Sequence, residues 1–231
     1  MDMKKFYEMV IGVHRDDFEK TVFPNCSCFV PLDAENREKV IDSLGKSQRF
    51  AYRGLCEEDP TFKQLIPYCI VTRGKEVFAY RRLPQSAEQR LVGKYSIGVG
   101  GHMNPARFGI DPIPTTFTDC LQENMLRELE EELNIEYPEK KPMIFNTVGL
   151  IDSRLDPVSS VHVAIVYHII LPLEATVEVA EKDVLEGKFL SMDDLADLTP
   201  QDMELWTEIV VDYYLSKFKG QEWFELQEDC N

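Results

Sequence analysis

The chain has 231 residues, of which 44% are hydrophobic and 29% are charged, so it can bury the core of a large domain and is not a disordered polypeptide. Its formal net charge of −16 argues against binding to duplex nucleic acid, because duplex affinity comes largely from Lys and Arg contacts to phosphate. No run of about 18 apolar residues predicts a membrane span, and no signal peptide is expected. We therefore expect a cytoplasmic protein whose six cysteines are reduced thiols.

The first 66 residues carry weak periodicity. A strand is predicted from Glu8 to Val13, and a helix from Ala34 to Leu44, which Asp33 caps and Gly45 ends. No linker-like composition precedes residue 67. We therefore expect residues 1–66 to be an extension packed on a core domain that spans 67–231.

A hairpin is predicted next, with strands at 67–72 and 76–80 joined at Arg73-Gly74. Arg81 and Arg82 follow it directly. Arginine can bind phosphate oxygens through two N–H groups, so both are candidate substrate-binding residues. Solvated strand ends would carry the same residues, and that alternative stays open.

Tyr95 to His102 reads as a short strand that enters a turn at Gly100 and Gly101. Glycine lets the main chain take unusual dihedral angles and approach a ligand closely. Both glycines are therefore candidate substrate-binding positions.

An acidic helix follows, and its clearest part is the segment from Arg127 to Leu133. Glu128, Glu131 and Glu132 stand at i, i+3 and i+4, so they are neighbours on the helix surface. Like charges so placed repel by a few tenths of a kcal/mol per pair. A hard divalent cation, Mg²⁺ or alternatively Mn²⁺, prefers such oxygen ligands. A solvated acidic face is the plainer explanation, and the flanking sequence is what favours a metal site.

The glycine turn and the helix together resemble the box of the Nudix hydrolases, G-x5-E-x7-R-E-U-x-E-E-x-G-U, where U is a bulky aliphatic residue. Arg127-Glu128 match the R-E pair, Glu131-Glu132 match the E-E pair, and Ile135 matches the last U. The resemblance covers about residues 67–195.

The chain departs from this pattern at three places. Asp119 stands for the first Glu, and Asn134 stands for the closing Gly, where a left-handed conformation is expected that Asn tolerates best after Gly. Between Gly101 and Asp119 there are 17 residues, 102–118, where the pattern has five. The added prolines and glycine predict a stiffened loop on the rim of the site.

Beyond the box, strands are predicted at 144–150, 161–171 and 184–190, and helices at 192–198 and 200–218. The packing face of the last helix is predicted to comprise Leu205, Trp206, Ile209, Val210, Tyr213 and Phe218. Strands and helices in this order indicate an α/β (α+β) fold. The resemblance implies a mixed sheet sandwiched between helices.

The resemblance also implies a function, which is Mg²⁺-dependent hydrolysis of a phosphoanhydride or phosphoester bond in a small nucleoside-diphosphate-type substrate. Glu128, Glu131 and Glu132 would be the metal ligands, and Arg127 would orient a carboxylate. Glu131, Glu178 and Glu181 remain alternatives for the general base.

Two other functions stay open. One is a non-catalytic ligand-sensing or protein-binding domain, which the departures at Asp119 and Asn134 make a real alternative. The other is a prenyl-diphosphate isomerase that would use a cysteine such as Cys69. The choice between pyrophosphatase and phosphoesterase, the exact substrate and the oligomeric state are all left open by the sequence.

Overall fold

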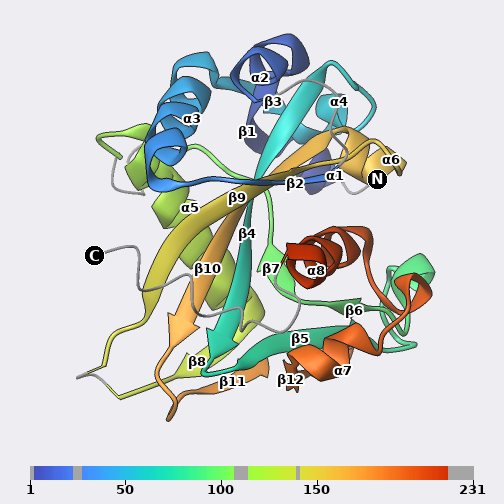
Figure 1. The fold of residues 1–231 in the computed structure, drawn as a ribbon. Coiled ribbons are helices and arrows are strands. Elements are labelled where there is room, and N and C mark those ends of the chain that lie inside the picture. The colour runs from blue at the N-terminus through green and yellow to red at the C-terminus, as the bar shows by residue number, and fades with distance from the viewer. Residues whose placement is uncertain (1–2, 23–27, 107–113, 139–140, 218–231) are drawn as a thin grey trace. The chain divides into compact units, whose positions relative to one another are not determined.

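The computed structural model describes residues 3–22, 28–106, 114–138 and 141–217 (Figure 1). The chain divides into two compact units. The first comprises residues 1–68, 100–128 and 147–166, and the second comprises 69–99, 129–146 and 167–231. The predicted division into 1–66 and 67–231 stays a prediction.

Among its described residues, the first unit contains three short strands and five helices. The strands are β1 (Met9–His14), β2 (Cys28–Pro31) and β3 (Arg49–Tyr52), and the helices are α1 (Met3–Phe6), α2 (Arg15–Thr21), α3 (Ala34–Ser47), α4 (Arg53–Cys56) and α6 (Pro157–Ser160). β1 pairs antiparallel with β3, and its end pairs with the start of β4 (Phe62–Arg73). Helices α2 and α3 lie side by side over this part of the sheet (Figure 1).

The strands of the second unit form antiparallel pairs. Its described strands are β5 (Glu76–Arg82), β6 (Tyr95–Ser96), β8 (Leu133–Glu136), β11 (Thr176–Val179) and β12 (Leu185–Ser191). Its described helices are α7 (Met192–Ala196) and α8 (Leu205–Lys217), and single 3₁₀ turns lie at Gln89–Leu91 and Pro200–Asp202. β5 pairs with β12 along its whole length and with β6 at its end. β8 and β11 form a separate two-stranded sheet.

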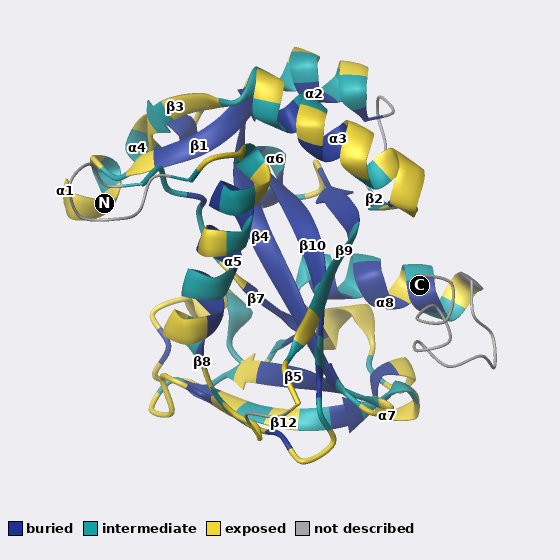
Figure 2. Ribbon diagram, turned by 90° about the vertical axis from the view of Figure 1, so that its left-hand side faces the viewer, coloured by how far each residue is buried: buried dark blue, intermediate teal, exposed yellow. Residues whose placement is uncertain are grey.

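Five elements have residues in both units: β4, β7 (Gly98–Gly100), α5 (Phe117–Glu132), β9 (Ile144–Asp152) and β10 (His162–Leu171). The main sheet has ten strands, with the order β12-β5-β4-β10-β9-β2 along its principal path. Its central strands are almost wholly buried (Figure 2). A large sheet flanked by helices confirms the predicted α/β class.

Most predicted elements occur at the expected place, but two helix ends are wrong. Asp33 caps α3 as predicted, yet Gly45 does not end the helix, which continues to Ser47. A Cβ atom on Gly45 would lie 2.8 Å from the Cβ of Phe117, so glycine at this position permits close packing against α5. The predicted helix at 200–218 is interrupted at Met203, whose backbone is extended, and α8 begins at Leu205.

The buried face of α8 differs from the predicted one by about one residue. Its most buried side chains are Thr207, Val210, Val211 and Tyr214, a spacing of i, i+3, i+4 and i+7. Leu205, Trp206, Ile209 and Tyr213 are only partly buried, and Phe218 lies outside the described residues.

Of two expectations about turns and loops, one is wrong and the other falls partly outside the described residues. Asn134 is not in a left-handed turn after the helix; it lies in β8, opposite Glu178 of β11, because the chain passes directly from α5 into this strand. The middle of the added loop, residues 107–113, lies outside the described residues. No helix in the described part of the chain has the length and apolar character that crossing a membrane requires.

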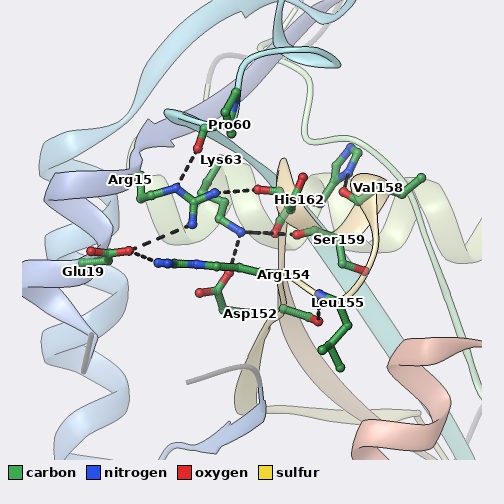
Figure 3. Close-up of polar contacts among 12 residues, drawn as sticks. Arg15, Glu19, Pro60, Lys63, Asp152, Arg154, Leu155, Val158, Ser159 and His162 are labelled. Atoms are coloured by element: carbon green, nitrogen blue, oxygen red, sulfur yellow. Dashed lines mark hydrogen bonds and ion pairs between the residues drawn. The ribbon is translucent and has the colours of Figure 1, made fainter. Parts of the chain in front are cut away.

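A buried ion pair fixes the interior of the first unit (Figure 3). Lys63 of β4 is fully buried and donates to Asp152 at 2.5 Å and to the carbonyls of Ser159 and His162 at 3.3 and 3.2 Å. Each Nζ hydrogen thus has an acceptor, as a buried ammonium group requires. The contacts join β4 to the end of β9, to α6 and to the start of β10.

Removal of one member of this pair should strongly destabilise the protein. Asp152→Asn leaves the Lys63 charge buried without its counter-ion, and we expect a loss of about 3–5 kcal/mol in the free energy of unfolding. Urea denaturation measures this loss. Glu186→Gln, which breaks the exposed pair with Arg81, is the matched control and should cost less than about 1 kcal/mol. Equal effects of the two changes would contradict the assignment.

Candidate active site

Glu128 of α5 is buried directly against the glycine turn. Its side chain is 8% exposed, and a Cβ atom built on Gly101 would lie 2.4 Å from its Oε2 atom. A Cβ atom on Gly100 would lie 2.0 Å from the carbonyl oxygen of Pro67. A side chain would fit at neither position, because Gly100 lies against a backbone carbonyl and Gly101 lies against the carboxylate of the acidic helix.

Arg127 provides the charge that a buried carboxylate needs. Its Nη2 atom lies 2.7 Å from Oε1 of Glu128 and donates to the carbonyl of His102 at 2.9 Å and to Oδ1 of Asn124 at 3.1 Å. The guanidinium group therefore binds the helix carboxylate and the glycine turn at the same time. Its role in orienting a carboxylate for catalysis stays a prediction.

Asn124, which the sequence analysis did not select, fixes the continuation of the turn. Its Oδ1 atom accepts from the Asn104 backbone N–H at 2.8 Å, and its Nδ2 atom donates to the Asn104 carbonyl at 3.0 Å. The Asn104 side chain donates in turn to Glu8 and to the Met9 carbonyl. Asn124 lies four residues before Glu128, so helical spacing is the signal that could have identified it.

A pair of histidines supports the same turn. His162 Nδ1 donates to the Val158 carbonyl at 2.7 Å, and the Nε2 atoms of His162 and His102 are 2.9 Å apart. Because the Val158 carbonyl can only accept, Nδ1 of His162 carries a hydrogen. In a neutral ring Nε2 of His162 then accepts, and Nε2 of His102 donates. Burial, followed by the charges of Arg53 and other nearby cationic groups, lowers the pKa of His102 to about 2.

In the second unit, the pKa of Glu132 is raised above its usual value. Burial is the largest cause of its raised pKa, and the charges of Glu181 and Glu131 raise it further, whereas Arg82 opposes the shift. Glu131 itself is exposed. The structure thus places Glu132 and Glu181 close enough for their charges to interact.

The remaining predicted residues are engaged in ion pairs. Arg81 pairs with Glu186 at 2.7 Å on the surface, and Arg82 pairs with Glu204 at 3.0 Å. Glu204 is largely buried, and burial raises its pKa while Arg82 lowers it. Sequence reasoning missed Glu204, because it lies just before α8 without any local motif.

Glu178 has an ion-pair partner of its own. It lies in β11 and forms an exposed ion pair with Lys182 at 2.6 Å. Glu181, three residues later, is the member of this segment whose charge affects Glu132.

The candidate ligands Glu128, Glu131 and Glu132 suit a hard divalent cation in their chemistry but not in how closely they converge. Among the residues that the structure describes, no three His, Cys, Asp or Glu side chains converge closely enough to hold a metal ion. All the candidate ligands are nevertheless carboxylates, and two neighbouring carboxylates and burial disfavour the charge on Glu132. A bound cation would favour that charge.

Comparison with known proteins shows which family this fold and sequence resemble. No protein-family model matches the chain. Protein YmaB of Bacillus subtilis (strain 168) is 36% identical over 211 residues, which cover 91% of this chain and 98% of YmaB. The crystal structure of Tm1382, described as a candidate Nudix hydrolase, superposes with a TM-score of 0.70 at 26% identity and covers 91% of this chain and 100% of Tm1382.

The chain belongs to the Nudix hydrolase family. The segment from Arg127 to Ile135 is accordingly the second half of its Nudix box. The resemblance inferred from these residues and from the glycine turn is confirmed, together with the fold that it implied.

The buried histidines predict that the protein loses stability in mild acid. An unfolded histidine has a pKa of about 6.5, whereas His102 in the folded state titrates near 2. The unfolded chain therefore binds the proton first, so the free energy of unfolding falls as the pH drops below about 6.5. Between pH 7 and 5, His102 alone should account for a fall of about 2 kcal/mol.

Denaturant titrations of His102→Gln at several pH values measure this contribution. Between pH 7 and 5, the free energy of unfolding of the variant should fall less steeply than that of the wild type, because about one proton fewer is taken up on unfolding. His14→Gln, which changes an exposed histidine, is the control and should keep the wild-type dependence. An unchanged slope in His102→Gln would show that the ring is not held neutral by its surroundings.

Proposed function

We propose that the protein is a Mg²⁺-dependent hydrolase that cleaves a phosphoanhydride bond in a small nucleoside-diphosphate-type compound. The observation that carries this proposal is the buried Glu128, which Arg127 holds against Gly101 in a chain of the Nudix family. Burial of a carboxylate against the main chain is costly even with a paired arginine, and a role in a metal-dependent site would explain why it is kept.

Glu128, Glu131 and Glu132 would hold the cation, for which Mn²⁺ is an alternative. When bound, it supplies neutralisation of the phosphate oxygens and activation of a water molecule. The chain's own part is positioning. Arg127 fixes the orientation of Glu128 and joins it to the His102 carbonyl, so that the acidic helix and the glycine turn act as one surface.

We assign the general base to Glu181. Its charge acts on Glu132, whereas Glu178 is held by Lys182 in an exposed ion pair. Glu131 is exposed and stays in the metal-ligand role. A base must lie within reach of the attacking water, and two observations support Glu181: its charge acts on Glu132, and the neighbouring Ala180 N–H donates to the Glu132 carbonyl at 2.8 Å.

Arg82 is the better candidate for a phosphate contact. It acts on the charge of Glu132, and its partner Glu204 is a buried carboxylate that keeps the guanidinium group in place. Arg81 is held by Glu186 on the surface. In so acidic a protein, a local guanidinium group and bound cations would be needed to attract a polyanionic substrate.

The isomerase alternative is disfavoured by Cys69, whose side chain is fully buried in β4. A thiol that acts on a substrate must be accessible to it. The sensor alternative predicts binding without turnover, and the experiment below separates it from hydrolysis.

Neutralising single carboxylates of α5 tests the proposal. With Mg²⁺ and a panel of nucleotide sugars, dinucleoside polyphosphates and nucleotide cofactors, the wild type should release phosphate-containing products. Glu128→Gln, Glu131→Gln and Glu132→Gln should lower kcat by about a hundredfold or more, because each would remove a charge from the metal site. Glu130→Gln, on the same helix but outside the cluster, is the control and should retain activity.

Circular dichroism and thermal unfolding show whether each variant is folded. Wild-type rates in both Glu131→Gln and Glu132→Gln would refute the proposal. Metal-independent stabilisation by a ligand, with no turnover of any substrate in the panel, would favour the sensor instead.

A further inference from the structure

Large apolar side chains are exposed at high density in two short segments of the first unit. Among the described residues, six of the eleven exposed large hydrophobic side chains lie within 3–9 or 50–55. They are Met3, Tyr7, Met9, Phe50, Tyr52 and Leu55, with exposed fractions from 36% for Met9 to 63% for Met3. Single exposed apolar residues need no explanation, but a concentration of them marks an interaction surface.

The elements that carry these side chains, α1, β1, β3 and α4, lie next to one another (Figure 2). Met9 of β1 is opposite Tyr52 of β3, and the ring of Tyr7 lies 5.8 Å from that of Tyr52 in an edge-to-face arrangement. Phe50 is two residues before Tyr52, so both project from the same face of the strand. Met3 and Leu55 belong to α1 and α4, which pack against each other beside this strand.

β3 is also an edge strand. Among the strands that the structure describes, it pairs with β1 alone. Its inward residue, Ala51, packs against the buried cluster of Val10, Cys56 and Phe62, which fixes the strand in position. The opposite edge of such a strand presents backbone N–H and C=O groups that can pair with another strand.

The surface is large enough for a specific contact. At roughly 200 Å² for a fully exposed side chain, the six residues leave about 600 Å² of apolar surface on each molecule. A standard interface buries about 800 Å² on each partner, and the main chain of a paired edge would add to the side-chain area.

Charge does not oppose a second copy of this chain as the partner at this surface. Two molecules with a net charge of −16 repel each other over most of their surfaces. The segments 3–9 and 49–57 are an exception, because they carry four basic residues and only two acidic ones. The acidic residues, Glu8 and Glu57, both pair with Arg53, so the surface around β3 carries little negative charge.

We propose that the protein forms a twofold dimer in which β3 pairs antiparallel with β3 of a second copy. A register centred on Ala51 places Phe50 of one protomer opposite Tyr52 of its partner. Aromatic pairs directly opposite each other on antiparallel strands are stabilising, and the twofold axis forms this pair twice.

Sedimentation equilibrium of the full chain tests this dimer. The wild type should have twice the 26.7 kDa mass of the chain and should dissociate on dilution. Phe50→Lys and Tyr52→Lys should each raise the dissociation constant by at least about tenfold, because each places a charge in the apolar contact. Leu173→Lys, which changes an exposed leucine of the second unit, is the matched control and should leave the dimer intact.

Thermal unfolding shows whether the variants are folded, and Tyr7→Lys provides a further test at the edge of the same surface. A wild-type protein that is monomeric at every concentration would overturn the proposal. So would a dimer whose dissociation constant is the same in folded Phe50→Lys and Tyr52→Lys as in the wild type.

Discussion

The close approach of the Glu128 carboxylate to the main chain at Gly101 is the constraint on which the candidate site depends. A side chain at position 101 would occupy the place of the carboxylate oxygens. Burial of that carboxylate is tolerable because Arg127 pairs with it, and Arg127 is in turn fixed by the His102 carbonyl and by Asn124. The acidic helix and the glycine turn are thus joined by one guanidinium group.

This arrangement depends on neutral polar groups as much as on charges. The His102–His162 pair and the two hydrogen bonds between Asn124 and the Asn104 backbone hold the turn from its other side. Each buried donor in this set has an acceptor, which is what a preorganised site requires. The Lys63–Asp152 pair secures the interior of the same unit, so the turn rests on a stable base.

The helical half of the site could be predicted from the sequence because its signal is local. Spacing alone places Glu128, Glu131 and Glu132 on one helix, and the pattern around Arg127 identifies the family. The supporting residues could not be predicted, since Asn104, His162 and Glu204 meet their partners through the fold and are scattered along the chain.

The errors in the elements have the same origin. Gly45 has the local signal of a helix end, but packing against Phe117 overrides it, and Asn134 has a turn signal that pairing with β11 overrides. The buried face of α8 was misplaced because eight of its thirteen residues are apolar or aromatic and occur on several sides of the helix, so periodicity alone did not distinguish its faces. Propensity is a weak guide wherever tertiary contacts decide.

Our central proposal is that the acidic end of α5 holds a divalent cation through Glu128 and Glu132. Anomalous diffraction from crystals soaked with Mn²⁺ tests it most directly. The account predicts one strong peak bonded to carboxylate oxygens of both residues at distances of about 2.0–2.6 Å. Carboxylates that point into solvent, with no peak beside them in well-soaked crystals, would contradict it.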